Sequence, residues 1–352
     1  MTYRIHLVAP PSTQLTKAYA LDGFTQATIR FARMLKELGH FVIIYGSEEC
    51  DAPYDELVQV VSKEEIAKAL GDCPYQYAAA ENKYPLWDLA NKHTIEAIQT
   101  RKQPKDFICL IGGTAQKPIA DAHPDLPAVE WSIGYEGTFA KYRVYESYAW
   151  MHTNYAKQGI NDGRFFDCAI PLLFSPEEYP FRAEKEPFAL YVGRLTPRKG
   201  LGIACLAAEA AGIPLKVIGH GDPSLVTNGA EYLGPLDDEQ KKDYMSRAQC
   251  LISPTQYIEP FGSVAVEAQL CGTPVISTDF GGFVETVEQG RTGWRCNYLG
   301  EFVRAIKDAV NLDPAYIRNR AIEKYSIDSV KHDYQHYFER LMLLWDNGFA
   351  TI

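Results

Sequence analysis

Short apolar runs alternate with helical stripes along most of the chain. The opening has an apolar run over residues 4–9, a helical pattern over 25–38 that Gly39 closes, and a second apolar run over 41–45. Uninterrupted apolar runs are typical of strands buried on both faces of a parallel sheet, while apolar positions at threes and fours line one face of a helix. The order strand, helix, strand predicts a Rossmann-like opening.

The same alternation continues toward the middle of the chain. Apolar runs over residues 106–111 and 127–133 predict two more strands. Ser62 with Glu65 three residues later forms the pattern of a capping box, which predicts a helix start, and another helix is expected after Pro85. Aromatic residues around that second helix fit either a core or the lining of an acceptor pocket: Tyr75, Tyr77, Tyr84 and Trp87.

A charged, proline-rich stretch over residues 171–187 divides the chain and predicts an interdomain linker. Beyond it the alternation resumes, with apolar runs over 188–193, 214–218, 250–252 and 275–278. Strands that alternate with helices indicate a parallel sheet in each half. We therefore expect one domain over 1–170, a second domain over 188–330, and a C-terminal helix over 331–352.

The densest candidate chemistry surrounds the start of one predicted helix. Glu259 lies in the loop just before it and Glu267 on its second turn. The residues that open this helix are Phe261, Gly262 and Ser263. Free N–H groups and partial positive charge let a helix N-terminus bind phosphate, so a nearby carboxylate suits a ligand with phosphate and hydroxyl groups. The alternative is an electrostatic cap at Glu259 and a solvated Glu267.

Two cations follow Gly193 in the loop after the first strand of the second half. The guanidinium of Arg194 can bind a diphosphate as a fork, and the ammonium of Lys199 can bind it as a point charge. The alternative is a solvated basic loop. Gly219 and Gly221 partly imitate a dinucleotide fingerprint, but the long helix that such a fingerprint requires does not follow.

Four segments of the second half stand in a fixed order. They are Gly-Arg…Lys-Gly within 191–200, Glu-Pro-Phe-Gly-Ser-Val-Ala-Val-Glu at 259–267, Gly-Gly-x-x-Glu within 279–285, and the turn at 289–294. In this order they resemble the motifs of retaining glycosyltransferases of family 4, in the glycogen-synthase-like group. The resemblance covers about residues 188 to 297. It implies a GT-B fold, in which two Rossmann-like domains face each other across a cleft. In such a fold 1–170 would be the acceptor-side domain and 188–330 the nucleotide-sugar domain, and the C-terminal helix over 331–352 would cross back to pack on the first domain.

The resemblance implies transfer of a hexose-type sugar from a nucleotide-diphosphate sugar to an acceptor hydroxyl, with retained configuration and without a metal ion. Glu259 would contact the hydroxyls of the donor sugar, and Arg194 with Lys199 would neutralise the leaving diphosphate. The residues expected at the nucleotide are Gly193, Arg194, Lys199, Gly219, Phe261, Gly262, Ser263 and Glu267, the last at the ribose hydroxyls. A UDP-sugar is the favoured donor, and the base, the sugar and the linkage stay open.

The first domain departs from the family pattern. Gly23, preceded by Asp22, is the one plain glycine where the family has a pair. Many family members carry a histidine near the transferring sugar, and neither His123 nor His152 matches that motif. The residues found there instead are Glu130, Trp131 and Tyr135, with Glu130 either an acceptor-side group or a structural carboxylate. In a front-face mechanism the departing phosphate deprotonates the acceptor, so the missing histidine matters less.

Two other functions stay open beside transfer. One is a nucleotide-sugar epimerase or hydrolase on the same fold, which would need acid and base groups around the sugar and no acceptor groove. The other is a non-catalytic subunit that binds a sugar nucleotide. Loss of turnover on substitution of Glu259 or Lys199, with folding intact, would distinguish an enzyme from such a subunit.

Composition restricts the partners. The chain has 352 residues and a net charge of −10, so its surface as a whole does not attract nucleic acid or an anionic membrane. No apolar run approaches a membrane span, and no signal peptide is evident. The eight cysteines form no Cys-x-x-Cys pair, which favours reduced thiols and a cytoplasmic protein. The acceptor could be a saccharide, a lipid, a protein, a metabolite or modified nucleic acid.

A metal site has little support in the sequence. His332 and His336 stand at helical i, i+4 spacing, but no third ligand is evident, so a surface helix pair is the better interpretation. The chain also has no Asp-x-Asp, the usual metal-binding signature of the other large glycosyltransferase fold.

Overall fold

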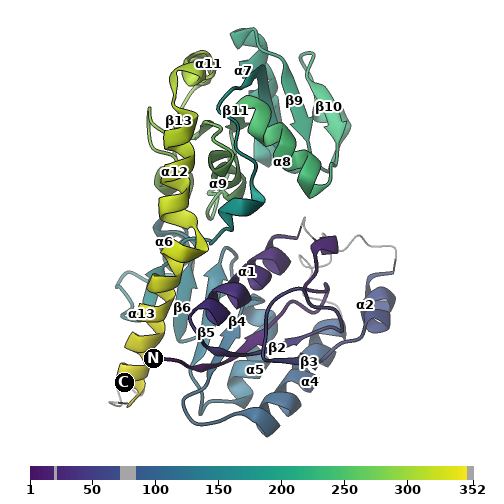
Figure 1. The fold of residues 1–352 in the computed structure, drawn as a ribbon, viewed down its shortest axis with the longest axis vertical. Coiled ribbons are helices and arrows are strands. Elements are labelled where there is room, and N and C mark those ends of the chain that lie inside the picture. The colour runs from purple at the N-terminus through teal and green to yellow at the C-terminus, as the bar shows by residue number, and fades with distance from the viewer. Residues whose placement is uncertain (20–21, 72–84, 347–352) are drawn as a thin grey trace. The chain divides into compact units, whose positions relative to one another are not determined.

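The computed structural model describes residues 1–19, 22–71 and 85–346, so Tyr75, Tyr77 and Tyr84 lie outside the described residues. The chain forms two compact units (Figure 1). Unit 1 comprises Met1–Glu146, Gly159–Leu173 and Val330–Ile352, and unit 2 comprises Ser147–Gln158 and Phe174–Ser329.

Unit 1 is built on a parallel sheet of order β3-β2-β1-β4-β5-β6-β7. Its strands are β1 (Arg4–Val8), β2 (Phe41–Gly46), β3 (Glu56–Gln59), β4 (Phe107–Leu110), β5 (Ala128–Ile133), β6 (Tyr142–Tyr145) and β7 (Asp167–Ala169). Its helices include α1 (Gly23–Glu37), α2 (Lys63–Leu70), α4 (Pro85–Arg101) and α5 (Lys117–Ala122). All four residues of β4 are buried, as the apolar run predicted.

The last helix, α13 (Ile327–Asp346), belongs to unit 1 from Val330 onward. The ring of Phe338 is fully buried and lies 5.0 Å from that of Phe107, on the central strand β4. Tyr337 donates a hydrogen bond of 2.7 Å from its hydroxyl to the carbonyl oxygen of Phe166. The C-terminal helix therefore contributes to the same core as the first strands of the chain. His332 and His336 are exposed on this helix.

Unit 2 is built on a parallel sheet of order β10-β9-β8-β11-β12-β13. Its strands are β8 (Glu186–Val192), β9 (Leu215–Ile218), β10 (Glu231–Gly234), β11 (Ala248–Ser253), β12 (Val275–Thr278) and β13 (Gly293–Cys296). Its helices are α6 (Tyr148–Gln158), α7 (Leu201–Ala211), α8 (Asp238–Arg247), α9 (Ser263–Leu270), α10 (Phe283–Thr286), α11 (Leu299–Asp308) and α12 (Pro314–Tyr325). The predicted α/β fold with two Rossmann-like halves is confirmed.

The compact units do not follow the expected domain bounds everywhere, since Phe174–Ser329 in unit 2 includes most of the stretch expected as a linker. Residues 147–158, expected in the first domain, form α6 and cluster with unit 2. The chain thus leaves unit 1 after Glu146 and returns to it at Gly159. The contacts that hold α6 in unit 2 involve side chains more than a hundred residues away, described below.

No helix among the described residues is long and apolar enough to span a membrane. Within the same residues, no group of three or more His, Cys, Asp or Glu side chains is placed to hold a metal ion. The cysteines that the structure describes are free thiols, and burial raises the pKa of the Cys271 thiol to about 12.

Candidate functional site

Two loops at the same edge of the unit 2 sheet pack directly on each other. One follows β8 and the other follows β11, its neighbouring parallel strand. Gln256 donates from its backbone N–H to the carbonyl of Arg198 at 2.8 Å and from its side chain to that of Pro197 at 3.2 Å. A Cβ on Gly200 would lie 1.9 Å from the carbonyl oxygen of Pro254, so only glycine fits there.

This packing brings Lys199 and Glu259 together. Lys199 Nζ donates to Glu259 Oε2 at 2.8 Å, and both side chains are mostly buried, with 19% and 14% of their surface exposed. Burial alone would lower the pKa of Lys199, but Glu259 and Tyr257 outweigh it and raise the pKa above its usual value. The pair is therefore an ammonium and a carboxylate in contact at the carboxyl edge of the sheet.

Tyr257 lies beside this pair, and sequence reasoning did not single it out. The Lys199 ammonium is 5.0 Å from the centre of its ring, and the Arg198 guanidinium is 4.7 Å from the same point. Both distances are within the range of cation–π attraction. Burial, with the charge of Glu259, raises the pKa of Tyr257. The Tyr257 ring thus makes cation–π contacts with two neighbouring cations of the first loop, Arg198 and Lys199.

Arg194 is exposed, and its guanidinium makes no hydrogen bond or ion pair within the described residues. Its backbone is fixed, because the Tyr191 hydroxyl donates to the Arg194 carbonyl at 3.1 Å. Leu195 N–H donates to the His220 carbonyl at 2.7 Å, which ties this turn to the one after β9. The structure therefore places Arg194 on the same loop as Lys199 and leaves its charge available to a ligand.

Gly193 and Gly219 lie against each other where β8 and β9 end. Gly193 N–H donates to the Ile218 carbonyl at 3.0 Å, and a Cβ on Gly219 would lie 1.8 Å from the Gly193 carbonyl oxygen. Gly219 has a φ of +151°, and the Tyr232 hydroxyl donates to its carbonyl at 2.9 Å. Backbone packing therefore requires glycine at position 219, whichever ligand the edge binds.

The N-terminus of α9 opens without a side-chain cap. Gly262 precedes it with a φ of +86°, and a Cβ there would lie 2.6 Å from the Phe283 ring. Phe261 is buried, with the Tyr325 ring edge-on at 5.7 Å, while Ser263 is exposed. The hydrophobic anchor at Phe261 fixes the helix start, and the uncapped N–H groups beyond it retain the anion-binding character expected of such an end.

The Gly281–Gly282 turn holds the backbone of Glu259 in place. Gly282 N–H donates to the Glu259 carbonyl at 2.7 Å. A Cβ on Gly281 would lie 2.8 Å from the Glu259 nitrogen, and one on Gly282 would lie 2.6 Å from the Phe261 Cα. The two glycines of the third motif thus permit a close backbone approach to the second motif.

Glu285, the last residue of that motif, caps α6. Its carboxylate accepts hydrogen bonds from the N–H groups of Tyr148 at 3.1 Å and Ala149 at 2.9 Å. Ser147 donates from its hydroxyl to the Pro260 carbonyl at 2.5 Å. These contacts place α6 against the loop that carries Glu259. A serine just before a helix is a capping signal that the sequence contained.

Glu130 is held as a structural carboxylate rather than presented to solvent. It is fully buried and accepts hydrogen bonds from the Tyr135 hydroxyl and from the N–H groups of Phe139 and Ala140, at 3.0–3.1 Å. Burial raises its pKa despite these bonds. Of the two interpretations of Glu130, the contacts favour the structural one.

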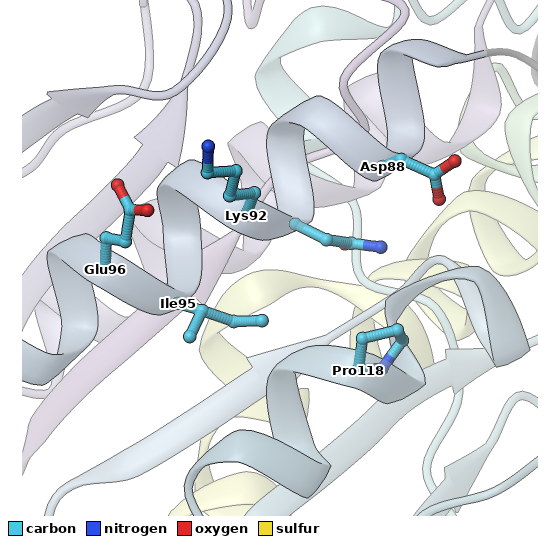
Figure 2. A pocket seen from close by; sticks show the side chains of 6 residues that line it. Asp88, Lys92, Ile95, Glu96 and Pro118 are labelled. Carbon is cyan, nitrogen blue, oxygen red and sulfur yellow. The ribbon is translucent and has the colours of Figure 1, made fainter.

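The pockets found in the described residues lie elsewhere. A groove of about 300 Å³ runs between α4 and α5, with Ile95 and Pro118 on its apolar floor (Figure 2). The other lining side chains labelled in Figure 2 are Asp88, Lys92 and Glu96. A second hollow of about 370 Å³ is lined by residues of α12 and by Arg291. Neither contains a predicted site residue.

The fold is that of known two-unit glycosyltransferases. AviGT4, a glycosyltransferase involved in avilamycin A biosynthesis, matches with a TM-score of 0.72 and 20% identity, over 97% of this chain and 98% of that one. Alr3699/HepE of Anabaena, solved in complex with UDP and glucose, matches with a TM-score of 0.67 and 15% identity, over 96% and 100%. The predicted GT-B fold class is confirmed.

Sequence comparison relates the second half of the chain to a particular glycosyltransferase family. Residues 177–326 match the family described as Glycosyl transferases group 1. Glycogen synthase of Mycobacterium tuberculosis is 33% identical over 152 residues, which is 38% of this chain and 36% of that protein. D-inositol 3-phosphate glycosyltransferase of Rhodococcus erythropolis is 34% identical over 125 residues, or 29% and 28%. The match spans about a third of each of these curated relatives. Residues 177–326 thus match the model of the group 1 glycosyltransferase family, and the resemblance that the four motifs indicated is confirmed.

Proposed function

We propose that this protein transfers a hexose-type sugar from a nucleotide-diphosphate sugar to an acceptor hydroxyl, with retention of configuration and without a metal ion. The observation that carries the proposal is the contact between Lys199 and Glu259 at the carboxyl edge of the unit 2 sheet. It brings together a cation suited to a diphosphate and a carboxylate suited to sugar hydroxyls, in the part of the chain that matches the glycosyltransferase family model.

The diphosphate would be bound by charges that the chain itself supplies. Arg194 has no partner within the described residues, and Lys199 is an ammonium at neutral pH. The uncapped start of α9, after Gly262, adds backbone N–H groups. As the bond between the sugar C1 and the diphosphate oxygen breaks, negative charge builds on that oxygen, and preorganised donors lower the barrier by stabilising it.

Glu259 would change partners when the donor binds. In the structure its carboxylate is satisfied by Lys199, so the site is electrically balanced before any ligand enters. A diphosphate that attracts Lys199 would leave Glu259 free to accept hydrogen bonds from sugar hydroxyls. The acceptor oxygen would then bond to C1 on the face that the diphosphate leaves, and its proton would pass to the departing phosphate.

The donor nucleotide is proposed to be UDP. Support comes from the fold relative of Anabaena, which was solved with UDP and glucose.

A thermal-shift screen with UDP-, GDP- and ADP-sugars in the presence of EDTA tests the proposal. Binding to the native state raises the melting temperature by mass action. We expect one nucleotide sugar to raise it in the wild type and Arg194→Ala to abolish the rise. Slow release of free sugar from that donor, lost in Glu259→Gln, would distinguish an enzyme from a binding subunit. The absence of any shift would overturn the proposed donor site.

A further inference from the structure

Two neighbouring lysines on α8 both contact Asp238, but they differ in their second partner. Lys241 Nζ lies 3.0 Å from Asp238 Oδ1 and 3.2 Å from Glu267 Oε2. Lys242 Nζ lies 2.6 Å from Asp238 Oδ2, and its ammonium stands 4.5 Å from the centre of the Tyr179 ring. Of the two lysines, Lys241 is the one that connects α8 to α9.

The Lys241–Glu267 contact is largely shielded from water. The Lys241 side chain is 12% exposed and the Glu267 side chain 16% exposed. Burial alone would lower the pKa of Lys241, but Glu267 and Asp238 outweigh it and raise the pKa above its usual value. Lys241 is therefore charged at neutral pH, and Asp238 has Lys242 as a second cation. Removing Lys241 would leave Glu267 as the unpaired carboxylate.

One carboxylate oxygen of Glu267 is bound by Lys241, and the other is available to accept a hydrogen bond from a ligand. Oε2 contacts Lys241, whereas Oε1 accepts no hydrogen bond within the described residues. Glu267 follows Ser263, the first residue of α9, by four positions, so the two share a face of the helix. The available oxygen thus lies one turn along from the helix start where the diphosphate is proposed to bind.

We propose that Lys241 is a positioning residue for nucleotide recognition, because it fixes Oε2 of Glu267 and leaves Oε1 to accept hydrogen bonds from ribose hydroxyls. The inference rests on the proposed function. A carboxylate that is already ordered loses less conformational entropy when it binds a ligand, and a fixed direction increases its selectivity for hydroxyls. Lys241 acts through Glu267 and touches no ligand in this scheme.

The test measures discrimination between ribose and deoxyribose. UDP, GDP and ADP are titrated calorimetrically into the wild-type protein, and the one that binds is compared with its 2′-deoxy and 3′-deoxy counterparts. A hydrogen bond to a charged acceptor is strong, so we expect the ribonucleotide to bind about tenfold or more tightly than at least one deoxy form. Glu267→Gln should reduce this ratio to below about threefold.

Lys241→Met should reduce the ratio in the same way, while Lys242→Met should leave it unchanged. The second variant is a matched control, since it also removes a buried lysine that pairs with Asp238. Adding Lys241→Met to Glu267→Gln should cause little further loss, because both changes act on one contact. Should Lys241→Met fail to fold, Lys241→Gln keeps a hydrogen-bond donor without the charge and should also reduce the ratio.

A wild-type ratio in a folded Lys241→Met or Lys241→Gln protein would overturn the inference and leave the proposed function intact. An equal reduction of the ratio in Lys242→Met would overturn it too, because the reduction would then result from destabilisation of α8 and not from the Lys241–Glu267 contact. If the wild type binds none of the three nucleotides, the proposed function and the inference fall together.

Discussion

Lys199 Nζ and Glu259 Oε2 lie 2.8 Å apart, although sixty residues separate them in the chain. Each residue comes from the loop after one of two adjacent parallel strands, β8 and β11. Ligands of open α/β sheets bind at this carboxyl edge. The contact brings the two motifs together before any ligand is bound, with a cation and an anion that balance each other.

The first prediction concerns Lys199→Met. We expect kcat to fall about a hundredfold or more, because a cation that stabilises charge on the leaving group would be lost. The variant also leaves Glu259 partly buried without a counter-ion, which costs roughly 1–3 kcal/mol of folding free energy. Donor turnover and urea unfolding measure the two effects separately.

A matched control for this experiment is Lys216→Met. Lys216 pairs with Glu231 at 2.9 Å in the same unit, but at a more exposed position away from the two loops. Its removal should leave kcat within about twofold and stability within about 1 kcal/mol. Unchanged turnover in Lys199→Met would contradict the assigned role.

The second prediction compares two glycines with positive φ. A Cβ on Gly219 would lie 1.8 Å from the Gly193 carbonyl oxygen, whereas a Cβ on Gly229 would meet nothing within 4 Å. Gly229→Ala should therefore cost only the strain of a left-handed backbone, about 1–2 kcal/mol. Gly219→Ala should cost more than about 3 kcal/mol and abolish the thermal shift with the donor. Equal losses in chemical denaturation would show that the edge tolerates backbone movement.

The third prediction concerns the cap of α6. Glu285→Ala removes the acceptor of two N–H groups, those of Tyr148 and Ala149, and should destabilise the protein by about 1–2 kcal/mol. Hydrogen exchange should become faster at the start of α6. Glu323→Ala is the control, because its carboxylate is 69% exposed and should contribute little. Unaltered exchange at the start of α6 would be inconsistent with a cap.

The fourth prediction follows from Glu288. Partial burial would raise its pKa, but Arg320 and Lys324 outweigh burial and hold the pKa at about 2, against an ordinary value of 4.5. Because the folded pKa is the lower one, the stabilisation is complete above pH 4.5 and is lost as the pH falls toward 2. With 24% of the side chain exposed, we expect roughly 1–2 kcal/mol after solvent screening.

Glu288→Gln should therefore destabilise the protein at pH 7, and its difference from the wild type should shrink between pH 4.5 and 3. Urea unfolding at pH 7, 4 and 3 measures this difference. A difference that stays constant with pH would mean that Glu288 acts through packing and not through its charge.

Local patterns predicted those parts of the fold that local interactions determine. The buried strands β4 and β11 are apolar runs, and the capping box at Ser62 is present as predicted. The strand β6 (Tyr142–Tyr145) was missed, because its aromatic residues fit a core cluster equally well. The apolar run over 250–252 and the glycine at the start of the next helix sufficed to locate the loop that carries Glu259.

Long-range contacts explain what the sequence alone did not predict. Glu285 and Tyr148 are 137 positions apart, and no local pattern links a carboxylate in one loop to the start of a distant helix. The partner of Glu267 was missed for a related reason. Lys241 and Lys242 have nearly the same sequence context, and only the packing of α8 against α9 distinguishes them.

The packing of α13 has a consequence for biosynthesis. Phe338, on α13, packs in the same core as Tyr3 and Phe107, at ring distances of 6.4 and 5.0 Å. During translation the core of the first unit therefore stays incomplete until α13 emerges from the ribosome, whereas Phe174–Ser329 has by then been made. Unit 1, whose synthesis begins first, is therefore the unit that completes its folding last.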